Sequence, residues 1–478
     1  MNVIIPHILN IAKEHNMDIY LVGGALRDII LDREVKDYDF VIDKMNGEFI
    51  EDIGKFLKKK VIILDKKRHI YRIVTDENII LDFAKLIGDN IKDDLFHRDF
   101  TINAMAYDLK SPWPIDIKKI IDPINGIKNL KEKIIKYVNK NVFTEDPIRI
   151  LRAVSFMSQL DFELDLETRE QIIKDAQKIK KVSGEKISME LFKILKEKKS
   201  HHYFNLMAGE LKVLEHIFPH IAEMKEVGQC KYHVVDSWTH SVYTMKLVEE
   251  YIYTKDLFED YIQKAYDRHL NDKITEDHRR YQLIKLGALL HDIGKPAAER
   301  VDEQGRTRFK GHEIVGAEII REYAKRLKLS KKENEILYRY VKLHMWPLVL
   351  YKNNDLSAKN LYKYFKMGNK ETLDILLIAL ADIVATRSIL NPDEEMKKFK
   401  TYIEYIASNY LTRYLELEDL GEVIIGNQIM EILKLPQGKE IGKIILDIKK
   451  AIFMGEIAFE KDSIVDYITK KYKGKMDL

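Results

Sequence analysis

The chain has one cysteine, Cys230, in 478 residues. A single thiol excludes internal disulfides and a cysteine-rich zinc site, and it is typical of proteins in a reducing compartment. No apolar run approaches the roughly 18 residues that a membrane span needs, and residues 1–6 lack the charged start of an export signal. We therefore expect a cytoplasmic protein without a membrane partner.

The chain also lacks a strong excess of charge of either sign. Its formal net charge is +3 with 33% charged residues, so the overall charge does not by itself indicate nucleic acid as a partner. Any RNA contact must be local, and the basic clusters are residues 58–60, residues 66–68, and Lys178 with Lys180 and Lys181. Such runs are usually solvated faces, and we favour only the last cluster as an RNA contact.

Two aspartates one position apart, Asp37 and Asp39, are the most informative feature that is present. On a strand, residues at i and i+2 face the same way, so these two share one side with Val35. Tyr38 and Phe40 then pack on the other side. Two carboxylates so close need a cation between them. Mg²⁺ prefers carboxylate oxygens, waters and phosphates, and two such ions can hold the attacking and leaving oxygens of a phosphoryl displacement.

A Gly-Gly turn precedes these aspartates. Without Cβ atoms, Gly23 and Gly24 let backbone N–H groups approach a triphosphate, and Arg27 in the following turn can add a positive charge. Asp-x-Asp alone is usually a solvated turn, and Gly-Gly before a helix is often only a cap. Together, the two fragments predict nucleotidyl transfer.

The combined run, Gly23-Gly24-x-x-Arg27-Asp28 followed by Asp37-x-Asp39, resembles the first motif of the DNA polymerase β-like nucleotidyltransferases. Its form is similar to that of class II tRNA CCA-adding enzymes and bacterial poly(A) polymerases. The resemblance implies an α/β head with a small mixed sheet and helices. It also implies that Asp37 and Asp39 bind two Mg²⁺ ions and activate the 3′-hydroxyl of tRNA toward the α-phosphate of CTP or ATP.

Two further stretches resemble motifs of the same family in the same order. In Arg98-Asp99-Phe-Thr-Ile-Asn103, the resemblance implies that Arg98 and Asp99 hold the triphosphate and ribose hydroxyls, with Asn103 also in the nucleotide site. His97 stands where an Arg is usual. The run that begins at Asp122 resembles a hinge between the catalytic head and a helical neck.

Residues 145–153 resemble a fourth motif of the family. Pro147 suits the first helical position, so a purely capping role for Asp146 is a serious alternative. Carboxylate accepts and guanidinium donates, so Asp146 and Arg149 can complement a base edge with an amino donor beside a ring-nitrogen acceptor. Cytosine and adenine present that pattern. The resemblance therefore assigns recognition of CTP and ATP to Asp146 and Arg149, and it places Arg152 toward the phosphates.

A third carboxylate is expected to complete the metal site, and Asp82 on another strand-like run is the candidate. The alternative is an edge-strand aspartate in solvent. Full CCA-adding enzymes usually have a long basic loop between this strand and the second motif, whereas only residues 85–96 intervene here. The short segment resembles enzymes that add only the two cytidines, and a surface deletion without consequence is the alternative.

The second half of the chain contains imidazoles and carboxylates in apolar helical settings, which are typical ligands of Mn, Ni, Zn or Fe ions rather than of Mg alone. In sequence order they are His240, His291, Asp292, His312, His344 and Asp382. The series resembles an HD-domain phosphohydrolase, an all-α fold. Four members match the basic ligand set of that fold, and His312 and His344 match the additional histidines of its more complete sites.

The resemblance to HD domains implies a metal-dependent phosphohydrolase, in which the metal supplies a nucleophile near neutral pH and stabilises charge. Lys295 could hold a substrate phosphate, and a surface lysine is an equal alternative. We expect His269 and His278, in a polar stretch, to be exposed to solvent.

These motifs divide the chain into an α/β head, a helical neck that selects nucleotides and binds RNA, a helical body with the HD site, and a helical tail as a candidate tRNA contact. The boundaries are residues 1–125, 126–199, 200–395 and 396–478. Alternating apolar residues predict strands at 19–22, 40–43, 61–64, 70–74 and 79–83. After residue 126 the fold is expected to be mostly all-α.

The sequence therefore predicts a template-independent tRNA nucleotidyltransferase that adds CCA, or only CC or A. Two alternatives stay open. A poly(A) polymerase shares nearly all of the head. An HD phosphohydrolase with an inactive, RNA-binding head is less favoured, because the residues of the head motifs are all intact: Asp37, Asp39, Arg98, Asp99, Asp146 and Arg149.

Overall fold

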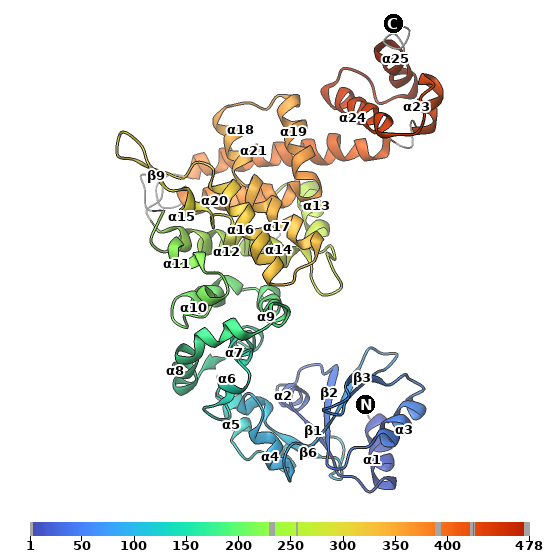
Figure 1. Ribbon diagram of the computed structural model, residues 1–478, viewed down its shortest axis with the longest axis vertical. Coiled ribbons are helices and arrows are strands. Elements are labelled where there is room, and N and C mark those ends of the chain that lie inside the picture. Colours follow the sequence, from blue (N-terminus) through green and yellow to red (C-terminus); the bar gives the residue numbers. More distant parts are fainter. Residues whose placement is uncertain are drawn as a thin grey trace. The chain divides into compact units, whose positions relative to one another are not determined.

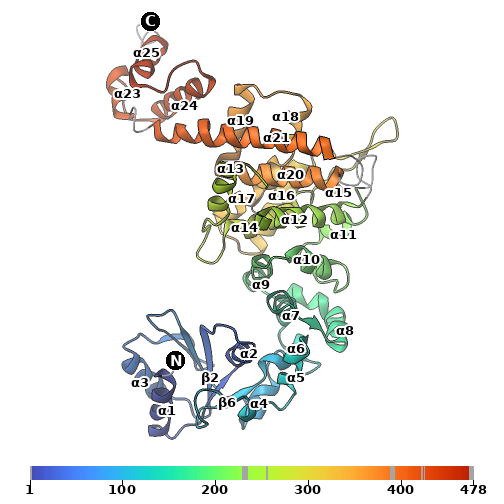
Figure 2. The same cartoon turned by 180° about the vertical axis from the view of Figure 1, so that it is seen from behind.

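The computed structural model describes residues 3–228, 235–254, 257–387, 393–420, 424 and 426–472. Cys230 and Ile425 lie outside these described residues. The chain forms two compact units: Met1–Glu197 with Leu206–Ile217, and Lys198–Asn205 with Phe218–Leu478. Figures 1 and 2 allow the elements of each unit to be followed along the chain.

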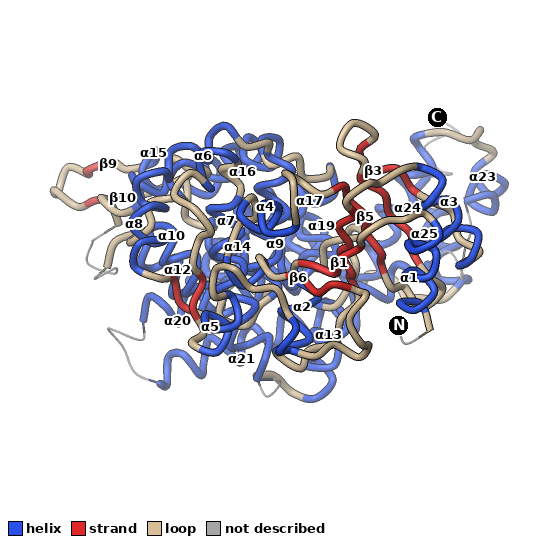
Figure 3. The backbone as a smooth tube through the Cα atoms, turned by 90° about the horizontal axis from the view of Figure 1, so that it is seen from below, coloured by secondary structure: helices blue, strands red, loops and turns tan. Residues whose placement is uncertain are grey.

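A six-stranded mixed sheet forms the head of the first unit, in the order β3-β4-β5-β2-β1-β6. Its strands, which make up the largest group of red segments in Figure 3, are β1 Ile19–Val22, β2 Asp37–Ile42, β3 Ile62–Asp65, β4 Ile70–Val74, β5 Ile80–Lys85 and β6 Ala106–Asp108. Only β2 and β5 run parallel among the paired neighbours of this sheet. The five strands predicted from alternation are confirmed, and β6 was not predicted.

The alternation along β2 and β5 separates an apolar face from a polar one. Phe40 and Phe83 are directly opposite each other across these strands, and their rings stack at 5.1 Å. Phe49 of helix α3 (Gly47–Leu57) packs edge-on against Phe83, so this face is covered by helix. The opposite face carries the aspartates of the same strands.

The remaining helices of the first unit surround the sheet or follow it as the neck. They are α1 Ile4–Glu14, α2 Gly24–Ile30, α4 Ile91–Phe96, α5 Gly126–Lys131, α6 Val142–Glu145, α7 Arg149–Leu160, α8 Leu166–Asp175 and α9 Gly184–Lys196. A short parallel pair, β7 Ile134–Ile135 and β8 Glu163–Leu164, lies within this neck.

The predicted hinge motif begins α5. The two oxygens of Asp122 accept hydrogen bonds from the backbone N–H groups of Gly126 and Ile127, at 2.7 and 2.9 Å. A Cβ at Gly126 would come within 2.3 Å of the Thr101 carbonyl oxygen, so only glycine lets this turn approach so closely.

The second unit is almost entirely helical. Its helices are α10 Ser200–Ala208, which crosses the boundary between the units, α11 His220–Met224, α12 Ser237–Thr254, α13 Asp260–Leu270, α14 Arg280–Leu290, α15 Lys295–Ala298, α16 His312–Arg326, α17 Lys331–Leu343, α18 Met345–Lys352, α19 Ala358–Gly368, α20 Thr372–Arg387, α21 Asp393–Asn409, α23 Gly426–Leu433, α24 Lys439–Met454 and α25 Lys461–Tyr472. A small hairpin, β9 Arg300–Val301 with β10 Thr307–Arg308, was not predicted.

A buried polar network joins α13, α14, α17 and α20. Asp374 is fully buried and accepts hydrogen bonds from Arg280 and from the Tyr340 hydroxyl, both at 2.8 Å. His269 Nε2 lies 3.0 Å from its other oxygen. The expectation that His269 and His278 are exposed is wrong: their side chains are 14% and 15% exposed, and His278 contacts the buried Glu333.

The tail has a small apolar core of its own. Buried isoleucines from α23, α24 and α25 pack together: Ile429, Ile441, Ile444, Ile448, Ile464 and Ile468. Residues between Leu433 and Lys439 form the connection between two helices. Across the part of the chain that the structure describes, no helix combines the length and the apolar character that crossing a membrane requires.

Candidate active site and candidate metal centre

The carboxylates of the head lie in register on neighbouring strands. Asp39 on β2 is directly opposite Asp82 on β5, and Asp37 is two residues earlier on the same face. Because β5 lies between β4 and β2, Asp82 is not on an edge strand, and that alternative is wrong. Three oxygen-ligand side chains therefore share one area of the sheet, and such hard donors suit Mg²⁺.

Asp39 is held next to the Gly-Gly turn. Gly23 has a φ of +73°, and a Cβ there would lie 3.1 Å from both the Asp39 Oδ2 atom and the Arg98 Nη1 atom. Burial raises the pKa of the Asp39 carboxyl; the Arg98 charge opposes this shift, and the carboxylates of Asp82 and Asp37 add to it. A cation at this position would offset the repulsion among the three carboxylates.

The second motif forms a chain of hydrogen bonds beside this turn. Arg27 donates to the Asn103 side-chain oxygen at 2.8 Å, and the Asn103 amide donates to Asp99 at 3.2 Å. Arg152 donates to the other Asp99 oxygen from two nitrogens, at 2.8 and 2.5 Å. Burial alone would raise the pKa of Asp99, but Arg152 and these hydrogen bonds outweigh it and hold the pKa below its ordinary value.

Arginines of three motifs are fixed by further contacts. Phe156 of α7 lies under the guanidinium groups of both Arg27 and Arg152, at 5.2 and 5.3 Å. Arg98 donates from two nitrogens to one oxygen of the buried Asp94, at 3.2 and 3.0 Å. The three guanidinium groups are thus positioned before an anion binds, which reduces the conformational entropy lost on binding.

A cavity of about 490 Å³ brings the second and fourth motifs together. Its lining is mostly polar and consists of His97, Arg98, Asp99, Asp146, Ile148, Arg149, Arg152, Lys186, Met189 and Glu190. Its size is sufficient for a small-molecule ligand.

Asp146 and Arg149 both line this cavity without capping the helix. Helix α7 begins at Arg149, its N-cap position is Ile148, and no side chain caps it, so the capping alternative for Asp146 is wrong. Arg149 donates to the His97 carbonyl at 3.0 Å and has its Nη1 atom 3.5 Å from Glu145. It does not pair with Asp146 in the described structure, so both groups remain available to a ligand.

Several residues at this site were not among the site residues predicted from the sequence. Met189 and Glu190 of α9 reach the cavity, and Glu190 is fixed by hydrogen bonds with Ser155 and Lys193 at 2.6 and 2.7 Å. Arg72 binds both oxygens of Asp82. These contacts depend on how distant segments pack, which no local pattern records.

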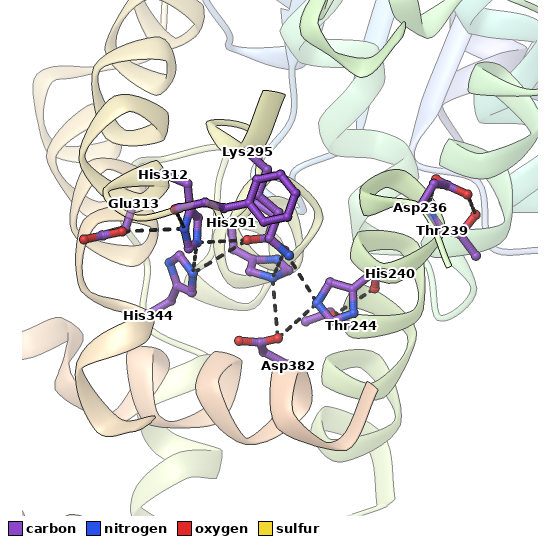
Figure 4. Close-up of polar contacts among 12 residues, drawn as sticks. Asp236, Thr239, His240, Thr244, His291, Lys295, His312, Glu313, His344 and Asp382 are labelled. Atoms are coloured by element: carbon purple, nitrogen blue, oxygen red, sulfur yellow. Dashed lines mark hydrogen bonds and ion pairs between the residues drawn. The ribbon is translucent and has the colours of Figure 1, made fainter. Parts of the chain in front are cut away.

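The predicted ligands of the second unit converge on one buried point. His240 comes from α12, the pair His291-Asp292 follows α14, and Asp382 is on α20. Figure 4 shows the side chains of His240, His291 and Asp382 pointing toward one another, with His312 and His344 beside them. His240 Nε2 lies 3.0 Å from an oxygen of Asp382, and His291 Nε2 lies 3.9 Å from the same oxygen.

Backbone carbonyls orient three of the imidazoles. The Nδ1 atoms of His291, His312 and His344 donate to the carbonyls of Ala288, Phe309 and Val341, at 2.7 to 2.8 Å. This fixes the tautomer, so each Nε2 atom is a lone-pair donor that faces the centre.

Asp292 stands between two sets of ligands. Its Oδ2 atom lies 3.2 Å from His291 Nε2 and 3.6 Å from His240 Nε2, and its Oδ1 atom lies 3.1 Å from His312 Nε2. The Nε2 lone pair of His291 is buried without a hydrogen bond to any described residue. Unsatisfied buried lone pairs are costly, and a divalent cation would satisfy them, so the donor set fits a transition metal.

The protonation states of three of these side chains also suit a metal. Burial and the neighbouring His291 and His312 lower the pKa of His344 to about 3, which keeps it neutral. Burial would raise the pKa of Asp292 and Asp382, but the surrounding imidazoles hold both below their ordinary value. Lys295 is buried with its Nζ atom 2.6 Å from Asp292, so its alternative as a surface lysine is wrong.

Three segments of the chain match known protein families. Residues 19–136 match the poly A polymerase head domain, residues 161–225 match a probable RNA and SrmB-binding site of polymerase A, and residues 238–387 match the HD domain. The fold and its sites therefore define a nucleotidyltransferase head that is joined to an HD domain.

Relatives that match almost the whole chain indicate which family of nucleotidyltransferases it resembles. The chain is 26% identical to the A-adding tRNA nucleotidyltransferase of Deinococcus radiodurans over 93% of each chain. It is also 26% identical to the CC-adding tRNA nucleotidyltransferase of Thermus thermophilus, over 93% of this chain and 92% of the relative. A Thermotoga maritima CCA-adding enzyme, solved with tRNA, shares the fold with a TM-score of 0.61 and 22% identity, covering 98% of this chain and 94% of its own.

The chain belongs to the family of class II tRNA nucleotidyltransferases and bacterial poly(A) polymerases, in the form that carries an HD domain. It is a nucleotidyltransferase.

Proposed function

We propose that the chain adds nucleotides from CTP and ATP to the 3′ end of tRNA, without a template. The observation that carries this proposal is the cavity that joins Asp146 and Arg149 to Arg98, Asp99 and Arg152. One place thus offers groups for a base edge and groups for a ribose and phosphates. The A-adding and CC-adding relatives support tRNA as the acceptor.

The head's own residues would prepare the reaction. Asp37, Asp39 and Asp82 would hold Mg²⁺, which when bound neutralises the triphosphate and lowers the barrier to attack by the 3′-hydroxyl. Arg98 and the backbone of Gly23 and Gly24 would hold the triphosphate in line with that hydroxyl.

Nucleotide selection would rest on two side chains. The Asp146 carboxylate accepts from an exocyclic amino group, and the Arg149 guanidinium donates to a ring nitrogen. Cytosine and adenine fit, whereas uracil and guanine would place like groups against each other. The His97 carbonyl already orients the Arg149 guanidinium. A nucleic-acid template is therefore not needed to position this group against the base.

The segment after β5 bears on the product. Only five residues separate the end of β5 at Lys85 from the start of α4 at Ile91. The Asp94 carboxylate accepts from the backbone of Ile87, and Asn90 caps α4, so the segment is tied down. This short connection favours CC addition as the product, and complete CCA or single A addition are the other products of the same chemistry.

Extension of a tRNA transcript with each of the four nucleoside triphosphates tests the proposal. Wild type should use CTP and ATP over UTP and GTP, and Asp146→Asn should reduce that preference by about tenfold, a loss of roughly 1.4 kcal/mol. Asp161→Asn, an exposed carboxylate that ends the same helix, is the control. Long A tails on any RNA, without use of CTP, would instead identify a poly(A) polymerase.

We propose a second activity, metal-dependent hydrolysis of phosphoesters, for the second unit. Its support is the convergence of four imidazoles and two carboxylates in a buried centre. Ni²⁺, Mn²⁺, Zn²⁺ or Fe²⁺ would be held there and, when bound, would supply a nucleophile near neutral pH.

Hydrolysis of bis-p-nitrophenyl phosphate or a 2′,3′-cyclic nucleotide with Ni²⁺ or Mn²⁺ tests this second activity. Asp292→Ala should abolish turnover, whereas Glu303→Gln, an exposed acid on the nearby hairpin, should not. Equal turnover by wild type and Asp292→Ala would contradict the assignment.

A further inference from the structure

Arg72 forms an ion pair with Asp82, the candidate third carboxylate of the head. It lies on β4 directly opposite Asp82 on β5, and its Nε and Nη2 atoms donate to the two Asp82 oxygens at 2.8 and 2.7 Å. Asp82 lies directly opposite Asp39 on the next strand. One row across three strands therefore places a guanidinium, the third carboxylate and a catalytic carboxylate on the same face of the sheet.

The contact is a strong one for a site that is open to solvent. Two parallel hydrogen bonds between a guanidinium and a carboxylate are shorter and stronger than those between neutral groups. The Arg72 side chain is 36% exposed and that of Asp82 is 23% exposed, so ions from solution can reach the pair. The hydrogen bond to Asp82 also raises the pKa of Arg72 against the effect of burial, so the guanidinium stays charged.

We propose that Arg72 holds Asp82 in the metal-free head and competes with Mg²⁺ for its oxygens, so that this positioning residue sets the cation affinity of the site. The inference rests on the proposed role of Asp82 as the third carboxylate. Without a cation, Asp37, Asp39 and Asp82 would repel one another, and Arg72 and Arg98 are the positive charges beside them. A cation that enters must take Asp82 from Arg72, which keeps the site preformed and lowers its affinity for free Mg²⁺.

Removal of the Arg72–Asp82 ion pair should therefore raise the affinity of the head for Mg²⁺. In Arg72→Gln, Asp82 is free, and Mg²⁺ should bind the head about twofold to fivefold more tightly, the range expected for a partly exposed ion pair. Arg72→Lys keeps the positive charge but cannot bind both oxygens in a fork. It should therefore show an intermediate increase in affinity.

Affinity cleavage by Fe²⁺ can measure the Mg²⁺ affinity of the head separately from that of the second unit. Fe²⁺ with ascorbate and peroxide cuts the backbone near a bound ion, and fragments that end near residues 37–39 or 82 are separated by size from those near residues 291–292. Mg²⁺ suppresses cutting at the head by competition, and its half-maximal concentration reports affinity without any measurement of catalysis. Cutting at the second unit is an internal control in the same sample.

Arg68→Gln is the matched control variant. Arg68 lies between β3 and β4, its side chain is 81% exposed, and it is 3.9 Å from Asp65 rather than paired with Asp82. The Arg68→Gln variant also removes one positive charge, so it measures any long-range electrostatic effect on cation binding. The double variant Arg72→Gln with Asp82→Asn should bind Mg²⁺ no more tightly than Asp82→Asn alone.

The possible results distinguish competition by Arg72 from the presence of a metal site in the head. A lower half-maximal Mg²⁺ concentration in Arg72→Gln, but not in Arg68→Gln, would support the competition. An unchanged or higher concentration in Arg72→Gln, or an equal decrease in both variants, would overturn it and leave the proposed function intact. No cutting at the head of the wild type would overturn the metal site itself, and the competition with it.

Discussion

Single residues of the head have sharply defined steric and electrostatic tasks. Gly23 combines a left-handed backbone, with φ of +73°, and a position where a side chain would press on Asp39 and Arg98. Gly24, its neighbour, has no positive φ, and a Cβ there would meet Arg27 at an ordinary distance of 3.4 Å. The two glycines are alike in sequence but carry different constraints.

Gly23→Ala should therefore be much more harmful than Gly24→Ala. A non-glycine residue in this conformation costs about 1–2 kcal/mol, and displacement of Asp39 adds to that, so kcat/KM for tRNA extension should fall by at least about tenfold. Steady-state kinetics of both variants, with thermal melting to check the fold, would measure this. Equal losses in the two variants would show that the φ of Gly23 is not the constraint.

Elements of the second unit are joined by buried charges rather than by apolar contacts alone. Burial raises the pKa of Asp374, but His269 and Arg280 outweigh it and hold the pKa below its ordinary value. A pKa that is lower in the folded state adds stability above the unfolded value of about 4, and this stability is lost as the pH falls through the folded value. The helices α13, α14, α17 and α20 should therefore loosen in acid.

Asp374→Asn should lower the free energy of unfolding of this unit by about 3 kcal/mol at pH 7, because Arg280 is left buried without its partner. Calorimetric melting between pH 3 and pH 7 would also show a weaker dependence on pH in the variant. Asp466→Asn, a carboxylate with a 60% exposed side chain in α25, is the control and should change little. Identical acid profiles for wild type and Asp374→Asn would show that Asp374 does not govern the stability of this unit in acid.

The candidate metal centre would also tie elements together, since its proposed ligands come from or adjoin α12, α14, α16, α17 and α20. Ni²⁺ or Mn²⁺ should raise the melting temperature of the second unit by several degrees, because a ligand that binds only the folded state adds RT ln(1 + [L]/Kd) to its stability. Chelation should reverse the rise, and Asp292→Ala should remove it. A rise of the same size in Asp292→Ala would place the ion elsewhere.

Strand patterns could be predicted from sequence, and several contacts could not. The alternation at 19–22 and 70–74 matches β1 and β4, whereas β6, β7 and β9 have two or three residues and give no pattern. Asp82 was found because it lies on a strand with a clear alternation. Its partner Arg72 depends on the register between β4 and β5, and the burial of His269 depends on Asp374, over a hundred residues away; neither is encoded locally.

For the whole molecule, two reactions are expected to reside in two units that are compact by themselves. Asp39→Ala should abolish nucleotide addition and leave phosphoester hydrolysis within about twofold of wild type. Asp292→Ala should do the reverse, because the head residues of the first site and the buried centre of the second share no side chain. Parallel assays of both variants would check this, and loss of both activities in either variant would refute their independence.

Nucleotide addition to tRNA is tested by extending transcripts that end at the discriminator base, at C or at CC, with CTP and ATP supplied singly and together in Mg²⁺. We expect the transcripts to grow by defined steps within CCA and then stop, and Asp39→Ala to add nothing. Growth of the discriminator transcript that stops at CC would identify the product favoured by the short segment after β5. No extension of any transcript, with wild type indistinguishable from Asp39→Ala, would show that the head does not add nucleotides to tRNA.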